Sequence, residues 1–524
     1  MKILHNARVH TLDKTQPVAS AVVIDHGQIV EVGGSELLGR FEGAERQDLR
    51  GRVILPGLID AHLHLQYYAL SLQKIDCEVD SLEACLERVH DRALITPRGE
   101  WIEGHGWNQN LWGRWPGASD LDRVAPDHPA YLTAKSLHAA WANSAALKLA
   151  GITAETPDPK DGKIQRDANG APTGVLLEGA VNLVAEIVPE PDLATLAAAI
   201  EKAQSTLWGF GLTGVHDFDR RESFMALQQL HADGRLKLRV TKSIPVELLG
   251  QASELGLRSG FGDDWLRIGS VKAFMDGALG PRTAAMIQPY AGEPENKGIL
   301  NLDGEQVFEI GRRAADVGLG MAVHAIGDRA NHELLDAYEQ LRSYETEKGL
   351  PHLRHRIEHV QLLHPDDAGR LAGLDIIASM QPIHATSDML MADKFWGERT
   401  AFAYAPKTQL ERGAHVAFGS DAPVESPNPF QGIHAAVTRR RADGSPSAEG
   451  WHPEQRLSVQ QAIEGFTIGA AYAANAENRL GRLAAGTWAD LIVLETDPFT
   501  CDPDELKDLR ASATMFGGEW VLQS

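Results

Sequence analysis

The stretch Gly57-Leu58-Ile59-Asp60-Ala61-His62-Leu63-His64 starts as an apolar run typical of a buried strand and ends in two histidines, two positions apart. Residues two apart on a strand project from the same side, so the His62 and His64 imidazoles are expected to lie next to each other. Two neighbouring imidazoles at the end of a strand can bind a metal ion together. Most pairs of this kind are nevertheless solvated or packed, so the metal interpretation depends on further ligands elsewhere in the chain.

Seven further apolar runs with strand character follow, with helix-like segments between several of them. Together with the first run they cover residues 57–64, 212–218, 236–244, 266–275, 320–325, 356–361, 375–381 and 416–420. Helical patterns occupy residues 193–210, 305–317 and 331–345. Parallel strands that are buried on both faces form continuous apolar runs, and eight of them alternating with helices predict an α/β fold, a (β/α)8 TIM barrel.

Both ends of the chain are rich in short apolar strands and predict one small β-sandwich domain, formed by residues 1–57 and 474–524. Its strands are expected at residues 1–4, 7–11, 19–24, 28–32, 47–55, 490–494, 513–515 and 520–522. The barrel is then assigned to residues 58–473. The first and second barrel strands are too far apart for one crossover, so residues 76–195 are interpreted as an inserted subdomain that folds over the barrel mouth.

Composition and charge narrow the class of protein. The chain has 524 residues, too many for one core, and its 43% hydrophobic and 23% charged residues are ordinary for a globular enzyme. A formal net charge of −22 argues against nucleic acid or an anionic membrane as a partner. No apolar run reaches the roughly 18 residues of a membrane helix, and the N-terminus does not resemble a signal peptide. With only three cysteines, a cytoplasmic location is expected.

Further polar residues lie at or near the ends of predicted barrel strands, as the first two histidines do. They are Lys272, His324, His359 and Asp421. Each has a structural explanation of its own, such as an ion pair of Lys272 with Asp276 or a turn shaped by Asp421. Side chains at the C-terminal ends of barrel strands converge on one site, however. Six such residues together therefore predict a metal centre at the barrel mouth.

The sequences around these residues resemble the amidohydrolase superfamily, and within it the amidohydrolase-3 branch that includes N-substituted formamide deformylases. The first-strand motif is Pro56-Gly57-Leu58-Ile59-Asp60-Ala61-His62-Leu63-His64. The other motifs typical of this branch are Val271-Lys272 followed by Asp276-Gly277-Ala278-Leu279-Gly280, Val323-His324-Ala325-Ile326-Gly327-Asp328, Gly419-Ser420-Asp421-Ala422-Pro423-Val424 and Gly486-Thr487-Trp488-Ala489-Asp490-Leu491-Ile492-Val493-Leu494. The resemblance covers essentially the whole chain. The branch is functionally broad, so it implies metal chemistry rather than one substrate.

The resemblance implies a binuclear centre of divalent metal ions, with Zn(II) favoured and Mn, Fe or Co as alternatives. His62, His64 and Asp421 would bind the more buried ion, and His324 and His359 would bind the second. An N-carboxylated Lys272 would bridge the two ions as a bidentate anionic ligand. Carboxylation requires a neutral amine, and a lysine among apolar walls has a depressed pKa. If Lys272 is unmodified, the site is expected to hold one ion.

The reaction implied by the resemblance is hydrolysis of a carbon–nitrogen bond other than a peptide bond by metal-activated hydroxide, with Asp421 as general acid and base. An amide or an N-substituted formamide is the expected substrate. The alternatives are a mononuclear deaminase, a dipeptidase or N-acyl-amino-acid deacylase of the same superfamily, and a non-catalytic barrel scaffold. Lys272 argues against the deaminase, and the complete ligand set argues against the scaffold.

Contacts with a small-molecule substrate are expected from four more residues. They are Trp107 and His138 in the insertion, Arg282 in the loop after the fourth strand and Glu425 after the eighth. Trp107 has packing inside the insertion as its alternative role. Arg282 would orient a polar or anionic group of the substrate. A homodimer is common for such enzymes, although no residue of this chain argues for one.

Overall fold

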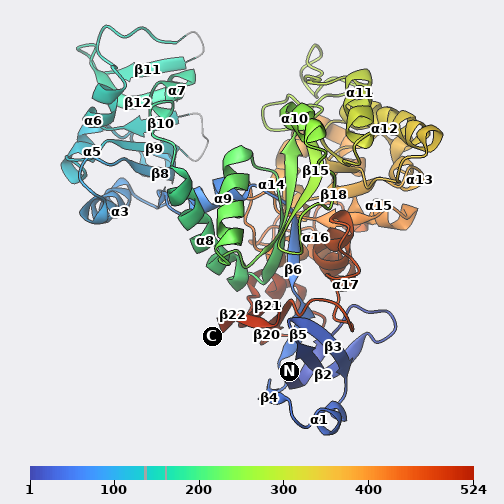
Figure 1. Cartoon of the computed structure of the whole chain (residues 1–524). Helices are drawn as coiled ribbons and strands as arrows, with labels where there is room; N and C mark the ends of the chain where they lie inside the picture. Colours follow the sequence, from blue (N-terminus) through green and yellow to red (C-terminus); the bar gives the residue numbers. More distant parts are fainter. Residues whose placement is uncertain (135–138, 160–161, 524) are drawn as a thin grey trace. The chain divides into compact units, whose positions relative to one another are not determined.

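Within the residues that this computed structural model describes (1–134, 139–159 and 162–523), eight parallel strands form one sheet (Figure 1). Their spatial order is β19-β18-β17-β16-β15-β14-β13-β6. Their bounds are β6 (Leu58–Leu63), β13 (Leu212–Asp217), β14 (Arg239–Pro245), β15 (Leu266–Phe274), β16 (Met321–Ala325), β17 (Arg356–His359), β18 (Ile377–Met380) and β19 (Val416–Phe418). All eight lie within the apolar runs from which strands were predicted, apart from single residues at their ends.

The two edge strands of this sheet, β6 and β19, meet through the backbone just beyond their C-terminal ends. The Asp421 N–H donates to the His62 carbonyl at 2.7 Å, and the His64 N–H donates to the Ala422 carbonyl at 2.8 Å. Every residue of β6 and β13 is buried, as expected of parallel strands covered on both faces. The predicted TIM barrel is therefore confirmed.

Helices connect the barrel strands and follow the last of them. Those between strands are α8 (Leu193–Gly209), α9 (Arg221–Ala232), α10 (Leu249–Glu254), α11 (Gly304–Ala315), α12 (Asp328–Lys348), α13 (Arg370–Gly373), α14 (Pro382–Trp396) and α15 (Pro406–Arg412). After β19 come α16 (Pro429–Thr438), α17 (Val459–Glu464) and α18 (Ala470–Ala473). Local signals set their ends. The α11 helix begins after Asp303, whose side chain accepts from the Gln306 N–H, and α12 ends at Gly349, which has a left-handed φ of 63°.

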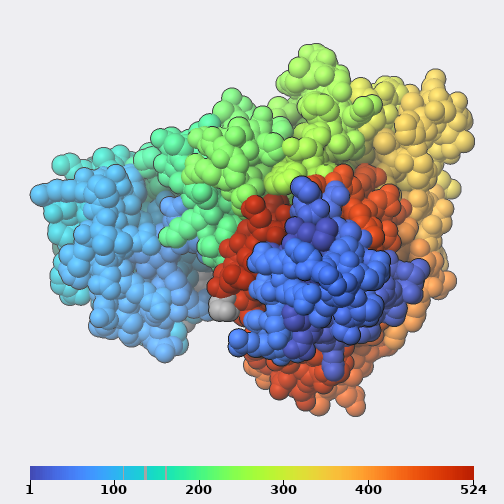
Figure 2. All heavy atoms as spheres, turned by 60° about the horizontal axis from the view of Figure 1, so that its bottom comes forward, coloured from blue at the N-terminus to red at the C-terminus, as the bar shows by residue number. Residues whose placement is uncertain are grey.

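Both ends of the chain share one sheet, with the order β22-β21-β20-β5-β1-β2-β3 and with β4 paired to β1. Its strands are β1 (Lys2–His10), β2 (Val18–Asp25), β3 (Gln28–Gly33), β4 (Glu45–Asp48), β5 (Val53–Pro56), β20 (Leu491–Leu494), β21 (Ala513–Phe516) and β22 (Glu519–Gln523). The termini are joined by antiparallel pairing of β5 with β20, and Figure 2 shows N-terminal and C-terminal segments side by side. The prediction that both ends build one β-domain is confirmed.

Two strand predictions at the N-terminus were wrong in detail. Residues 1–4 and 7–11 form a single strand, β1, because a register shift after His5 bends the strand without ending it. Residues 47–55 instead form two strands, because Arg50 and Gly51 adopt positive φ values of 54° and 83° and make a turn.

The chain divides into two compact units, one formed by residues 1–68 and 200–524 and the other by residues 69–199. The second unit has a sheet in the order β11-β12-β10-β9-β8-β7. Its elements are β7 (Ile75–Asp76), β8 (Ile102–Trp107), β9 (Ala130–Ala134), β10 (Ala139–Ala142), β11 (Gly162–Arg166), β12 (Pro172–Glu178), α3 (Leu82–Ile95), α4 (Gln109–Trp112), α5 (Ala118–Val124), α6 (Ser144–Leu149) and α7 (Asn182–Ala185). Among the helices of the described residues, none combines the length and the apolar character that a membrane crossing requires.

Candidate metal centre

The six residues expected to bind metal all lie at the C-terminal end of the barrel. His62, Lys272, His324 and His359 belong to β6, β15, β16 and β17, whereas His64 directly follows β6 and Asp421 lies in the loop after β19. Side chains from five different strands can meet there because parallel strands present their C-terminal ends to the same mouth. The structure thus brings together residues that lie up to 359 positions apart in the sequence, from His62 to Asp421.

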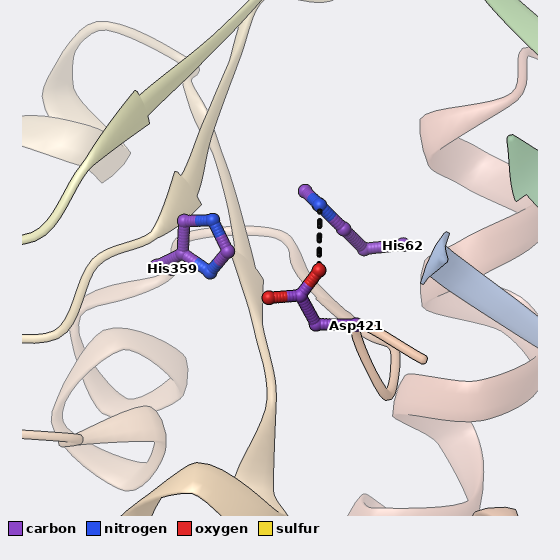
Figure 3. A group of neighbouring side chains, drawn as sticks. All are labelled: His62, His359 and Asp421. Atoms are coloured by element: carbon purple, nitrogen blue, oxygen red, sulfur yellow. Dashed lines mark ion pairs between the residues drawn. The ribbon is translucent and has the colours of Figure 1, made fainter. Parts of the chain in front are cut away.

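The centre of this group is the Asp421 carboxylate. Its Oδ1 atom lies 3.4 Å from His62 Nε2 and 3.5 Å from His64 Nε2. His359 approaches from β17, and ligand atoms of His62, His359 and Asp421 all lie within 4.8 Å of one another. Figure 3 shows these three side chains pointing toward one another. One divalent cation would fit between them, since imidazole and carboxylate are the ligands that Zn(II) and similar ions take.

His324 extends the group beside His359, and Lys272 lies between the Phe218 ring, which stacks on His62, and the Phe274 ring, which contacts His324. The His324 and His359 rings are 4.5 Å apart between centroids. The Lys272 ammonium lies 4.8 Å from the Phe218 ring centre and 4.7 Å from that of Phe274, and its Nζ has no hydrogen-bond partner among the described residues. Burial lowers the pKa of Lys272 to about 8. The lowered pKa leaves a larger fraction of the Lys272 amine neutral near pH 8 than an exposed lysine has at that pH.

Each of the four histidines has one ring nitrogen bonded to a neighbouring oxygen. The pairs are His62 Nδ1 with Glu358 Oε2 at 2.6 Å, His64 Nδ1 with Asp219 Oδ1 at 3.0 Å, His359 Nδ1 with Gln381 Oε1 at 2.8 Å, and His324 Nε2 with the Gly277 carbonyl at 3.0 Å. An oxygen acceptor requires the bonded nitrogen to carry the proton, so the other nitrogen keeps a lone pair. This is the arrangement in which outer oxygens orient metal-binding imidazoles.

Burial also sets the charge of these groups. It lowers the pKa of His62, His324 and His359, and that of His324 falls to about 3. Burial lowers the pKa of His64 as well, but the hydrogen bond and charge of Asp219 outweigh it, so that pKa is raised. Burial raises the pKa of Asp421 to about 6. Three of the imidazoles are thus held in the neutral form that binds metal.

The backbone is in a left-handed conformation at two of the candidate ligands. The φ angle is 76° at His359, 45° at the following Val360 and 60° at Asp421. Such values are rare for residues other than glycine and cluster at functional sites. Alternation along β17 would place Glu358 and His359 on opposite sides, yet Glu358 bonds His62 and the His359 ring lies 4.9 Å from the His62 ring. The turn at the strand end therefore brings both side chains to one site.

Asp60 holds the first and last barrel strands together behind the centre. Its Oδ1 accepts from the N–H groups of His62 at 2.9 Å and Ser420 at 3.1 Å, and its Oδ2 accepts from the Ser420 hydroxyl at 2.5 Å. Gly419 permits this close approach, because a Cβ there would clash with the His62 nitrogen and lie 2.7 Å from Asp60 Oδ1.

Gly419→Ala is therefore expected to push β19 away from β6 and to loosen the metal centre. Overpacking of this kind lowers the free energy of unfolding by about 1–3 kcal/mol. Thermal denaturation and metal analysis of the purified variant measure the two effects. Gly209→Ala is the matched control, since nothing lies within 4 Å of its added Cβ. Normal stability and metal content in Gly419→Ala would contradict the idea that the close contact of Gly419 with His62 and Asp60 holds β6 and β19 together.

The outer residues of the site were missing from the sequence interpretation. Glu358, Asp219 and Gln381 bond the histidines, and His384 on α14 lies 3.9 Å from Asp421 through its Nε2 atom. Glu358 is the direct neighbour of His359, but alternation along a strand predicts that the two side chains point to opposite faces, so none of these outer residues had a usable sequence signal. The suggested ion pair of Lys272 with Asp276 was wrong, because the Asp276 carboxylate instead accepts three backbone N–H groups, from Ala285, Ile326 and Gly327.

The four expected substrate contacts lie in different surroundings. The Arg282 Nε is 2.8 Å from Glu293 Oε1, and burial raises the pKa of Glu425. Both residues belong to the barrel unit. Trp107 is fully buried in the core of the second unit, where its indole N–H donates to the Leu132 carbonyl at 2.8 Å. His138 lies outside the described residues. A substrate contact stays a prediction for each of them.

Comparisons with known proteins identify the family of the chain. The model of the amidohydrolase family matches residues 45–522. Protein LONG AFTER FAR-RED 3 from Arabidopsis thaliana is 34% identical, with 99% of this chain and 91% of that protein covered. N-substituted formamide deformylase from Arthrobacter pascens is 29% identical, with 98% and 96% covered. A metal-dependent hydrolase from Pyrococcus furiosus superposes with a TM-score of 0.79 at 33% identity, over 95% of this chain and 100% of that one. The chain therefore belongs to the amidohydrolase family and is a metal-dependent hydrolase.

Proposed function

We propose that this protein hydrolyses the carbon–nitrogen bond of a small amide, with N-substituted formamides as the favoured substrate class. The observation that carries the proposal is a set of four imidazoles beside the Asp421 carboxylate and the Lys272 amine. Each imidazole has one nitrogen hydrogen-bonded to an oxygen, which leaves the lone pair of its other nitrogen for a metal ion. The similarity to a formamide deformylase over 98% of the chain supports the choice of substrate.

In this proposal His62, His64 and Asp421 would hold one Zn(II) ion, and His324 and His359 would hold a second. Lys272, if N-carboxylated, would supply an anionic oxygen ligand to both. Bound divalent ions supply Lewis acidity, which polarises a carbonyl group and lowers the pKa of water toward about 7. The Lys272 amine suits carboxylation because it is buried, has no hydrogen-bond partner among the described residues and has a lowered pKa.

Asp421 is proposed to move the proton during the reaction. Its carboxylate takes the proton of the attacking water while the new carbon–oxygen bond forms. It then delivers that proton to the amide nitrogen as the carbon–nitrogen bond breaks, so a formamide yields formate and an amine. The position of Asp421 supports this role, because one carboxylate oxygen faces His62 and His64 and the other lies 3.9 Å from His384. Arg282 and Glu425 are proposed to contact the rest of the substrate.

Metal analysis combined with an amide screen tests the proposal. The purified protein is expected to bind two equivalents of divalent metal and to hydrolyse formamides within a panel that also contains cyclic amides, N-acyl amino acids and aminated heterocycles. One equivalent of metal together with release of ammonia from a heterocycle would instead indicate a mononuclear deaminase. Metal-loaded protein that hydrolyses nothing in the panel would contradict the proposed reaction.

A further inference from the structure

One polar atom beside the metal centre is neither a candidate ligand nor bonded to another group. It is Nε2 of His384, on the first turn of α14, which follows barrel strand β18. The residue is only 6% exposed, and this atom has no hydrogen-bond partner among the described residues. A buried nitrogen left without a partner costs about 1–3 kcal/mol. A fold that keeps such an atom at its reactive centre points to a partner that arrives with the substrate.

The unbonded Nε2 atom of His384 faces the Asp421 carboxylate. It lies 3.9 Å from Asp421 Oδ2, too far for a hydrogen bond, whereas Asp421 Oδ1 faces the other histidines. The His384 and His359 rings are nearly parallel, with an interplanar angle of 14° and 6.1 Å between centroids. The two rings line one cavity together with Gln361, Gln381 and Tyr404. Because 3.9 Å separates His384 Nε2 from Asp421 Oδ2, an atom bound between these two groups would meet His384 Nε2.

The other ring nitrogen determines where the proton of His384 sits. The Gln361 amide Nε2 lies 3.3 Å from His384 Nδ1. The opposite end of that amide, Oε1, lies 3.1 Å from the Tyr404 hydroxyl, whose single proton also has Asp388 Oδ2 within reach at 2.7 Å. Burial raises the pKa of Asp388, and its protonated carboxyl would donate to the Tyr404 oxygen, so that the hydroxyl donates to Oε1 and the Gln361 NH2 group faces the imidazole. Because an amide N–H only donates, Nδ1 has to accept, and a neutral imidazole then carries its single proton on Nε2. His384 thus presents an N–H donor to the centre.

We propose that His384 donates this Nε2–H to the carbonyl oxygen of the substrate as negative charge develops on it, a role that rests on the proposed amide hydrolysis. When water adds to the carbonyl carbon, the π electron pair of the C=O bond moves to this oxygen while the proton of water passes to Asp421. The pair returns when the carbon–nitrogen bond breaks. A fixed N–H donor in a site without bulk water stabilises the negatively charged oxygen of the tetrahedral intermediate more than it stabilises the neutral amide. His384 would then complement the metal ions as a catalytic residue contributed by α14, the helix after β18, which like β13 and β14 is a barrel strand whose end supplies no proposed ligand.

Three substitutions separate a donor from a structural role. His384→Leu is expected to lower kcat by about 10²–10³-fold with a smaller change in KM, as found when one such donor is removed. His384→Gln can still place an N–H near the same point and is expected to recover part of the loss. Gln361→Glu replaces the donor to Nδ1 with an acceptor, so the proton moves to Nδ1 and activity should fall as in His384→Leu. All three should keep the metal content of the wild-type protein.

Binding of formate gives a readout that needs no turnover. Calorimetry on the metal-loaded protein is expected to show about tenfold or greater loss of formate affinity in His384→Leu, since one hydrogen bond to a charged group is removed. His434→Leu is the matched control, because His434 is 3% exposed within α16 and is not a site residue. It should leave kcat and formate affinity unchanged.

The outcomes distinguish this inference from the proposed function. If the wild-type protein hydrolyses amides but His384→Leu changes neither kcat nor formate affinity, the assignment of His384 fails alone. If His384→Leu instead shifts the acid limb of the plot of kcat/KM against pH, and His384→Gln recovers no activity, then His384 acts only by positioning Asp421. That outcome also overturns the donor role. If no amide is hydrolysed while formate affinity falls as expected, the donor site stands and the proposed reaction fails.

Discussion

Asp421→Asn is expected to lower kcat/KM for the best amide substrate by about 10³-fold, the size of a typical general acid–base contribution. An amide side chain fills the same volume but cannot take the proton of water or return it to the leaving nitrogen. The fold should tolerate the change, because burial already disfavours the charged carboxylate and raises the pKa of Asp421 to about 6. Steady-state kinetics, metal analysis and thermal denaturation measure activity, loading and stability separately.

Asp367→Asn is the matched control for this variant. Asp367 is also buried, at 1% exposure, but it pairs with His332 at 2.9 Å and Arg370 at 3.1 Å rather than with any candidate ligand. Its substitution should reduce stability by weakening these pairs and leave kcat unchanged. The expected contrast is therefore a stable, inactive Asp421→Asn protein and a less stable, active control. Near-normal turnover in Asp421→Asn would remove the proton-transfer role from this residue.

The barrel was predictable because parallel strands buried on both faces must be apolar throughout, and all eight runs are visible in the sequence. The ends of strands were less predictable. The turn at Arg50 and Gly51 that divides β4 from β5 depends on positive φ values, and Gly51 alone marks it in the sequence. The joined termini were also expected, but which strands meet was not, since pairing of β5 with β20 depends on contacts between residues more than 400 positions apart.

At the site, the candidate ligands were predictable and their supporting residues were not. A strand-end histidine such as His359 is recognisable from its place in the chain. Glu358 next to it was not, because strand alternation argues against two neighbours facing one site, and the left-handed φ values of His359 and Val360 have no sequence signal. His384 lies inside a helix, so no strand-end pattern marks it. Such outer contacts follow from tertiary packing, which a single sequence does not display.

Lys272→Met is expected to reduce the bound metal from two equivalents to one and to lower kcat by at least about 10²-fold, as expected when a metal that polarises the substrate is lost. Methionine has a similar length and suits the space between the Phe218 and Phe274 rings. Stability should stay the same or rise, because the Lys272 amine is buried without a hydrogen-bond partner among the described residues. Metal analysis, kinetics and denaturation give the three readouts.

Lys242→Met supplies the contrast, since Lys242 is equally buried but pairs with Asp217 at 2.9 Å. Removing it leaves a buried carboxylate unpaired, which costs about 3–5 kcal/mol. The two buried lysines should therefore respond in opposite ways: loss of metal without loss of stability at Lys272, and loss of stability at Lys242. A Lys272→Met protein that kept two metal equivalents and full turnover would contradict the bridge.

The proposed carboxylation of Lys272 predicts that metal loading depends on pH and on carbon dioxide. The amine attacks the carbon of CO2 and loses a proton, so only its neutral form reacts. Because the pKa of Lys272 is lowered to about 8, the amine is mostly protonated below that pH and mostly neutral above it. Apoprotein should thus take up the second metal more completely at about pH 8.5 with bicarbonate than at about pH 6.5 without it.

Chemical rescue tests the same carbamate in a variant. In Lys272→Ala, acetate or propionate should restore part of the metal loading and activity by occupying the place of the carbamate. A bridge formed by any other group would show neither the bicarbonate dependence nor the rescue.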